Sequence, residues 1–124
     1  MNTMKNTLRG LGVASLLAIC NSVHAQDARS GQQVFAQCEA CHSVDGTNGV
    51  GPSLKGIVGR KSGSLPGFRY SSAMKGAGLV WNDKTLNDYV ADPQKAVPGN
   101  VMPYSGIADA KQRKDLIAYL KTVR

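Results

Sequence analysis

The stretch FAQCEACHSV, residues 35–44, places Cys38, Cys41 and His42 within five positions. The chain has only 3 cysteines and 2 histidines among its 124 residues, and the remaining cysteine and histidine both lie within residues 1–25. Because thiols and imidazoles are the side chains that most often bind metals or form covalent links, this short segment is predicted to carry the chemistry of the protein. Which chemistry it carries depends first on the compartment in which the cysteines are found.

The N-terminus has the pattern of a secretory signal peptide. Lys5 and Arg9 give a positive start, an apolar run follows over residues 11–20, and small residues precede the expected cleavage site before Gln26. The apolar run is short for a helix that spans a bilayer. We therefore expect export and cleavage, with a retained membrane anchor or lipid attachment at Cys20 as the alternatives.

Cleavage of residues 1–25 would leave one small domain, residues 26–124. Of the 15 Lys and Arg residues only Lys5 and Arg9 are removed and all 8 acidic residues stay, so the formal charge falls from +7 to +5. A chain of this length has a thin hydrophobic core and gains from a disulfide, a metal or a cofactor. The charge does not indicate nucleic-acid binding, because the chain shows no basic cluster interleaved with stacking aromatic residues.

Hydrophobic periodicity and turn residues predict an all-α domain with long loops. We expect helices over residues 27–41, 71–75, 82–90 and 109–123. Frequent Gly, Pro and Ser predict a loop from residue 45 to 68, and three prolines predict another over 92–106. No segment has a convincing strand pattern. Long loops in a small domain are usually functional, and these are long enough to wrap a large flat group.

Four kinds of site bring two cysteines and a histidine this close: a disulfide, a thiol redox site, a zinc site and a covalent haem. A Cys38–Cys41 disulfide suits an oxidising compartment, whereas a thioredoxin-like site needs a βαβ context that this chain lacks. A structural zinc needs four ligands, more than these residues supply. The spacing C-x-x-C-H is the signature of c-type haem attachment, in which residues at i and i+3 share a face and His42 binds the iron. We therefore favour haem.

A second axial ligand for that iron is expected to be a methionine, because residues 26–124 contain no second histidine. Met74 lies in an expected helix and is typical of soft core packing. Met102 lies in the loop segment VPGNVMPYSG, where flanking prolines suit a sulfur held at a fixed point. We predict Met102 as the ligand.

The chain resembles the class I c-type cytochromes, the mitochondrial-type cytochrome c and its periplasmic bacterial relatives. The matching stretches run in the family's order and cover nearly all of residues 26–124: CEACHSV, GPSLKGIVGRKSGSLPGFRYS, LVWNDKTLNDYVADP, VPGNVMPYSGI and DLIAYLK. The resemblance implies the small cytochrome c fold around one covalent haem c. It implies one-electron transfer between respiratory or photosynthetic complexes or dehydrogenases, and no enzymatic activity. With the signal peptide, it implies a bacterial protein of the periplasm.

The resemblance also implies roles for individual residues. Cys38 and Cys41 match the thioether attachments, and His42 and Met102 match the axial ligands. Pro52 matches the proline whose carbonyl accepts the ring N–H of His42. The other expected haem contacts are Arg60, Tyr70 and Trp81 at the inner propionate, Asn100 where the family often has a propionate-binding threonine, and Tyr89 beside the methionine sulfur. A solvated charge for Arg60 and plain core packing for Trp81 and Tyr89 are the alternatives.

Two further matches concern helix packing. Gly31 and Phe35 match positions where the N-terminal helix of the family packs against the C-terminal helix, here near Leu116 and Tyr119. A glycine at position 31 would let the two backbones approach closely.

The resemblance fails at the charges around the expected haem edge. Positions where the mitochondrial protein carries lysines are uncharged here, namely Gln37, Val50, Gln94, Val101 and Ala108, while Lys95 and Lys111 remain. We therefore expect some electrostatic steering toward redox partner proteins with partly acidic docking faces, over a more apolar contact surface. We expect a monomer with no nucleic-acid partner and no stable membrane insertion of the mature chain.

Two other functions stay open on the residues alone. A haem peroxidase or ligand sensor would leave the iron without Met102. A small exported binding module would have a Cys38–Cys41 disulfide and no haem.

Overall fold

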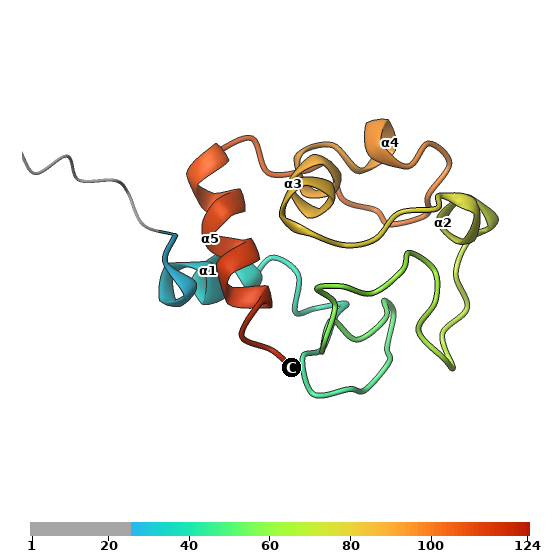
Figure 1. Cartoon of the computed structure of the whole chain (residues 1–124), viewed down its shortest axis with the longest axis horizontal. Coiled ribbons are helices and arrows are strands. Elements are labelled where there is room, and N and C mark those ends of the chain that lie inside the picture. Colours follow the sequence, from blue (N-terminus) through green and yellow to red (C-terminus); the bar gives the residue numbers. More distant parts are fainter. Residues whose placement is uncertain (1–25) are drawn as a thin grey trace, which may run out of the picture.

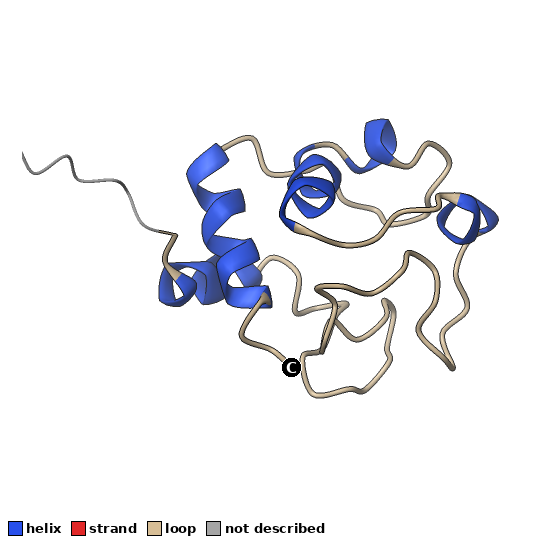
Figure 2. Ribbon diagram, in the orientation of Figure 1, coloured by secondary structure: helices blue, strands red, loops and turns tan. Residues whose placement is uncertain are grey.

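The computed structural model describes residues 26–124, so the expected signal peptide lies outside the described residues. The described helices are, in chain order, α1 (Ala28–Phe35), α2 (Ser72–Gly76), α3 (Asp83–Ala91), α4 (Pro93–Ala96) and α5 (Ala110–Leu120). Over residues 26–124 the only β pairing is an isolated antiparallel bridge between Lys61 and Val80. The prediction of an all-α domain with long loops is confirmed (Figure 2). None of the helices within residues 26–124 is long and apolar enough to cross a membrane.

Side-chain caps set where the helices begin. Asn82 and Thr85 form a reciprocal capping box at the start of α3, and Asp109 accepts a hydrogen bond from the N–H of Gln112 at the start of α5. The short helix α4 lies in a segment expected to be loop. Asp92 caps it and Pro93 takes its first position, a combination that favours a helix start. That expectation was therefore wrong over residues 93–96.

The first helix is shorter than expected. The periodicity predicted a helix to Cys41, but α1 ends at Phe35 and residues 36–41 continue as turns. The N–H of Cys38 donates to the carbonyl of Phe35 at 2.7 Å, and the N–H of His42 donates to that of Cys38 at 2.9 Å. These turns place Cys38 and Cys41, which are three positions apart in the sequence, on the same side of the chain. The chain then bends away from α1.

Helices α1 and α5 cross at one end of the molecule, on the left of Figure 1. Their backbones meet at Gly31, where an added Cβ would lie 1.9 Å from the carbonyl oxygen of Asp115. The rings of Phe35 and Tyr119 pack with centroids 5.4 Å apart. The expected close approach at Gly31 is confirmed, since only a residue without a Cβ fits there.

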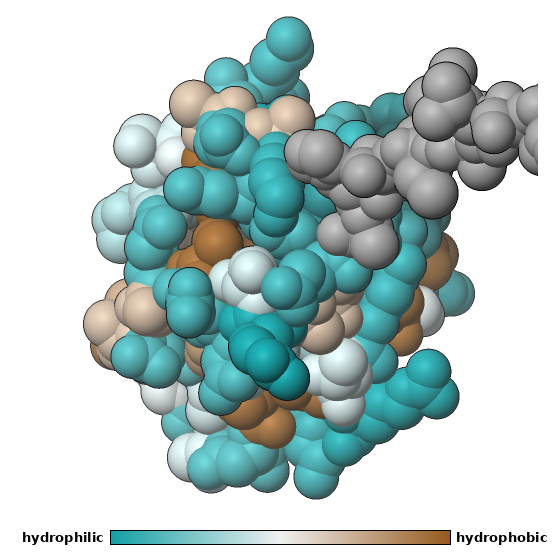
Figure 3. Space-filling view, turned by 90° about the vertical axis from the view of Figure 1, so that its left-hand side faces the viewer, coloured by the Kyte–Doolittle hydropathy of each residue, from teal (hydrophilic) through white to brown (hydrophobic). Residues whose placement is uncertain are grey.

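A buried carboxylate reinforces this helix crossing. Asp115 is 3% exposed and accepts hydrogen bonds from the Asp27 N–H at 3.0 Å and from Lys111 Nζ at 2.6 Å. These two bonds hold the pKa of the Asp115 carboxyl below its ordinary value, and the bond from the Asp27 amide has the larger effect. The outer face of this end of the molecule is mainly hydrophilic, with small separate apolar areas (Figure 3).

The hydrophobic core lies between the helix crossing, α3 and the loops. Its buried apolar side chains come from every part of the described chain: Phe35, Ile57, Trp81, Leu86, Tyr89, Val97, Ile107, Leu116, Ile117 and Leu120. The loops over residues 41–70 lie on one side of this core and α2, α3 and α4 on the other (Figure 1). Side chains from both sides line a cavity.

Candidate cofactor site

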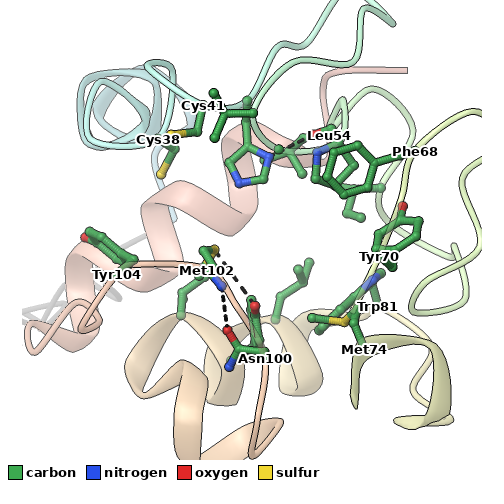
Figure 4. A pocket seen from close by; sticks show the side chains of 18 of the residues that line it. Cys38, Cys41, Leu54, Phe68, Tyr70, Met74, Trp81, Asn100, Met102 and Tyr104 are labelled. Carbon is green, nitrogen blue, oxygen red and sulfur yellow. Dashed lines mark hydrogen bonds between the residues drawn. The ribbon is translucent and has the colours of Figure 1, made fainter. Parts of the chain in front are cut away.

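A cavity of about 360 Å³ opens between the loops over residues 41–70 and the segment around Met102 (Figure 4). This volume lies within the range typical of small-molecule and cofactor sites. Every expected haem residue lines the cavity: Cys38, Cys41, His42, Pro52, Arg60, Tyr70, Trp81, Tyr89, Asn100 and Met102. Residues up to 64 positions apart in the chain are thus brought to one site.

His42 is oriented by its own loop. Its Nδ1 lies 2.7 Å from the carbonyl oxygen of Pro52, which can only accept a hydrogen bond, so Nδ1 carries the hydrogen. The lone pair of the ring is then on Nε2, the atom available to bind a metal. Gly51 leaves room for this ring, because a Cβ there would lie 2.5 Å from His42 Cε1. The predicted hydrogen bond between His42 and Pro52 is present.

The two cysteines lie together at one edge of the opening (Figure 4). Both are half-buried, and the structure forms no disulfide between them. Within residues 26–124 no group of three or more His, Cys, Asp or Glu side chains could hold a metal ion. The zinc hypothesis therefore finds no ligand set, whereas two adjacent thiols suit attachment of one group along its edge.

Met102 is held by two polar contacts on the opposite side from the cysteine segment. The side-chain oxygen of Asn100 accepts a hydrogen bond from the Met102 N–H at 3.0 Å, and the hydroxyl of Tyr89 lies 3.8 Å from the sulfur. Burial raises the pKa of Tyr89 to about 12, so its hydroxyl stays protonated and can donate to the sulfur. Met74 also lines the cavity, but from α2, at a different part of the wall (Figure 4).

The residues expected near a propionate, Arg60, Tyr70 and Trp81, all line the cavity. The guanidinium of Arg60 donates to the carbonyl oxygens of Ser53, at 2.9 Å, and Lys55. The hydroxyl of Tyr70 accepts a hydrogen bond from the N–H of Leu65 at 3.3 Å. Trp81 is buried and packs against Tyr89 with ring centroids 5.2 Å apart. Contacts of these residues with a propionate stay predictions.

Asn100 has a different observed role from the expected one. Its side-chain amide donates to the carbonyls of Pro93, at 2.8 Å, and Val97, at 2.9 Å, while its oxygen accepts from Met102. The residue is 6% exposed. In the structure Asn100 therefore anchors the methionine loop, and its binding of a propionate stays a prediction.

Sequence reasoning missed Gln94 as a functional residue and considered it only as a position without charge. Its Nε2 donates to the Asn100 carbonyl at 2.9 Å and its Oε1 accepts from the Gly99 N–H at 3.2 Å. Gln94 thus fixes the segment that leads to Met102. A glutamine followed five residues later by glycine has no specific local pattern, so only the fold identifies this role.

The residues present fit a haem. The cavity is mostly apolar, which suits a porphyrin, and it offers paired thiols, an imidazole with free Nε2 and a thioether. Arg60 and Tyr70 add polar groups to its lining. These donors are those of a c-type haem with histidine and methionine ligands.

Comparison with known proteins agrees with this donor set. The family model described as "Cytochrome c" matches residues 28–124. The chain is 44% identical over 112 residues to "Cytochrome c2" of Blastochloris viridis, with 89% of this chain and 88% of that protein covered. It is 47% identical over 98 residues to "Cytochrome c" of Gibberella zeae, with 77% and 92% covered.

A solved structure has the same fold. The structure described as "cytochrome cH from Methylobacterium extorquens" superposes with a TM-score of 0.75 at 49% sequence identity, covering 77% of this chain and 98% of that one. The two chains therefore share one fold over nearly all of that structure.

Proposed function

The chain belongs to the class I cytochrome c family, and we propose that it shuttles single electrons between redox proteins of the periplasm, with His42 and Met102 as the axial ligands of its haem. Membership of the family makes the chain an electron carrier with one covalent haem c, and not an enzyme. The observation that carries the proposed ligand pair is that the imidazole and the thioether line one apolar cavity whose edge holds both cysteines.

When bound, haem c supplies an iron that gains and loses one electron between its ferric and ferrous states. Cys38 and Cys41 would hold that group in place. The Pro52 carbonyl keeps the His42 imidazole in the tautomer whose Nε2 is free. The Tyr89 hydroxyl contacts the Met102 sulfur and Asn100 holds the Met102 backbone N–H, so the residue stays on the wall of the same cavity. With His42 and Met102 both bound to its iron, that group would have no vacant position for small ligands such as oxygen, which suits electron transfer alone.

Absorption spectra of the oxidised and reduced protein test the ligand pair, after expression with haem-attachment machinery. We expect a low-spin protein with the weak sulfur-to-ferric-iron band, and loss of that band in Met102→Ala. A matched Met74→Ala variant, which removes the other methionine of the cavity wall, should keep the band. A high-spin wild type that binds cyanide rapidly would favour the peroxidase or sensor alternative. A colourless protein would favour the binding module.

Export to the periplasm is supported by the signal-like residues 1–25 and by bacterial cytochrome c2 relatives such as that of Blastochloris viridis. The mass of the haem protein recovered from the periplasmic fraction tests this proposal. We expect a chain that begins at Gln26. A chain that keeps residues 1–25 and sediments with membranes would instead indicate a retained anchor.

Docking of the proposed partners would depend little on charge. Val50 and Val101 line the cavity and are each 76% exposed. Of the two lysines that remain at the family's basic positions, Lys111 is paired with Asp115 at 2.6 Å, which leaves Lys95 without an ion pair within the described residues. We propose a contact surface with an apolar centre and few free charges, for partners with partly acidic faces.

Rates of oxidation by an anionic and by a cationic inorganic complex, measured against ionic strength, test this proposal. We expect a preference for the anion, with a dependence on ionic strength weaker than the net charge of +5 alone would give, because Val50 and Val101 line the cavity where the mitochondrial protein carries lysines. A steep fall of the anion rate with salt would show a strongly basic surface and contradict the proposal.

A further inference from the structure

The loop that carries Met102, residues 100–108, is tied mainly to one side of the cavity. At its start Asn100 bonds to the carbonyls of Pro93 and Val97. At its end the Ile107 N–H donates to the Val90 carbonyl at 2.8 Å, and Arg113 donates to the Ile107 carbonyl at 2.8 Å. All these partners belong to the segment from α3 to α5. They fix the ends of the loop but do not hold it against the cysteine segment across the opening.

One side-chain hydrogen bond does cross the opening. The hydroxyl of Tyr104 donates to Oε1 of Gln37 at 2.7 Å, between residues 67 positions apart. Within residues 26–124 this is the only hydrogen bond from residues 100–108 to any residue before position 80. Figure 4 shows Tyr104 beside Met102, on the side of the opening where Cys38 lies.

Both partners of this bond are coupled directly to residues proposed to hold the haem. The Tyr104 N–H donates to the Met102 carbonyl at 2.9 Å, so the two residues form one tight turn. Gln37 precedes Cys38, and its N–H donates to the Val34 carbonyl at 3.2 Å, which fixes its backbone at the end of α1. A movement of Tyr104 away from Gln37 would therefore move the Met102 backbone away from the cysteine segment.

We propose that the Tyr104–Gln37 hydrogen bond keeps the methionine loop closed over the cavity and so restricts replacement of Met102 by external ligands. Tyr104 and Gln37 are positioning residues in this proposal, which rests on Met102 being an axial ligand. Gln37 is exposed, so water competes for its oxygen and the bond contributes modestly to closure. An external ligand binds only the open form, so its apparent affinity reports the fraction of open molecules.

The proposal is tested by titrating the ferric haem protein with imidazole. Loss of the sulfur-to-iron absorption band reports binding. Tyr104→Phe and Gln37→Leu each remove this hydrogen bond. If the bond has the usual net strength, its loss should raise the affinity for imidazole about two- to tenfold. The double variant should match the single ones, because either change removes the same bond. Gln37→Glu keeps an acceptor oxygen and should stay near the wild-type affinity.

Two matched controls separate this effect from a general loss of stability. Tyr119→Phe removes a hydroxyl that makes no hydrogen bond within the described residues, and Gln32→Leu removes an exposed helical glutamine. Both should bind imidazole as the wild type does. Denaturant unfolding of every variant shows whether imidazole affinity changes beyond what global stability predicts.

Two results would overturn the proposal: wild-type imidazole affinity in Tyr104→Phe, or additive effects of the two substitutions. Failure of the proposed ligand pair gives a different result. In that case the wild type would lack the sulfur-to-iron band and Met102→Ala would bind imidazole with unchanged affinity.

Discussion

Replacement of Gly31 by alanine should be among the most damaging single-methyl changes in the protein. The new Cβ would lie 1.9 Å from the Asp115 carbonyl oxygen and 2.8 Å from the Cβ of Tyr119. A normal carbon–oxygen contact is about 3.3 Å, so α1 and α5 would have to separate by roughly 1.4 Å. Neither near atom can give way alone, because one belongs to the α5 backbone and the other is attached to it.

The expected loss follows from three terms. Forced overpacking costs about 1–3 kcal/mol, and weakening of the Phe35–Tyr119 pair and of the Asp27–Asp115 hydrogen bond adds about 1 kcal/mol. Alanine is a better helix former than glycine by about 1 kcal/mol, which offsets part of this. We expect the free energy of unfolding to fall by about 1–3 kcal/mol, a large share of the total for a small domain.

Gly76→Ala is the matched control. Gly76 ends α2, and a Cβ there would meet nothing within 4 Å. The substitution should be neutral or stabilise the protein by up to about 1 kcal/mol, because alanine lowers the conformational entropy of the unfolded chain. Guanidinium unfolding of the haem protein, followed by circular dichroism, measures both variants. If Gly31→Ala is as stable as Gly76→Ala, the helices do not touch where the structure places them and the reasoning fails.

Three further changes have definite expected outcomes. Asp115→Asn should lower the free energy of unfolding at pH 7 by about 1 kcal/mol, because a neutral amide accepts weaker hydrogen bonds than a buried carboxylate. The folded-state pKa of Asp115 lies below its ordinary value of 3.8, so its contribution is complete above that pH and is lost as the pH falls through the folded-state pKa. The difference between the wild type and Asp115→Asn should therefore shrink in unfolding measured toward pH 2, and a constant difference would contradict the account. Gly51→Ala should displace the His42 ring, seen as loss of the low-spin spectrum, whereas Gly49→Ala in the same loop, whose Cβ would make only an ordinary contact at 3.7 Å from the Cys41 carbonyl oxygen, should keep that spectrum. Val101→Lys should steepen the ionic-strength dependence of oxidation by an anionic complex while changing stability by less than about 0.5 kcal/mol.

The features that the sequence predicted correctly depend on neighbours within about four residues. The expected helix starts at Asn82 and Asp109, which cap α3 and α5, and the C-x-x-C-H spacing are of this kind. The same local reasoning predicted a first helix that is longer than the observed one. Periodicity continued through Cys38, but the chain turns after Phe35 to bring His42 beneath Pro52.

The features that the sequence could not predict join distant segments. Nothing near Gln37 indicates that Tyr104 will be its partner, and nothing near Gln94 indicates that it holds the Asn100 carbonyl. The resemblance to a family supplied the roles of Pro52 and Tyr89, but it compared Gln37 with a lysine and so directed attention to charge. A side chain that differs from its relatives has to be interpreted from its contacts in this chain.

The long loops are specified by polar side chains that bind backbone groups. In the loops over residues 41–70, Ser53 accepts a hydrogen bond from the Gly46 N–H at 3.0 Å, Asn48 accepts one from the Ser53 N–H at 3.0 Å, and Arg60 donates to the Ser53 carbonyl at 2.9 Å. These bonds replace the ladder that a helix or sheet would provide, because buried backbone groups need partners. In both long loops, therefore, polar residues that are typical of loops by composition bind backbone groups. They fix the segments that carry His42 and Met102.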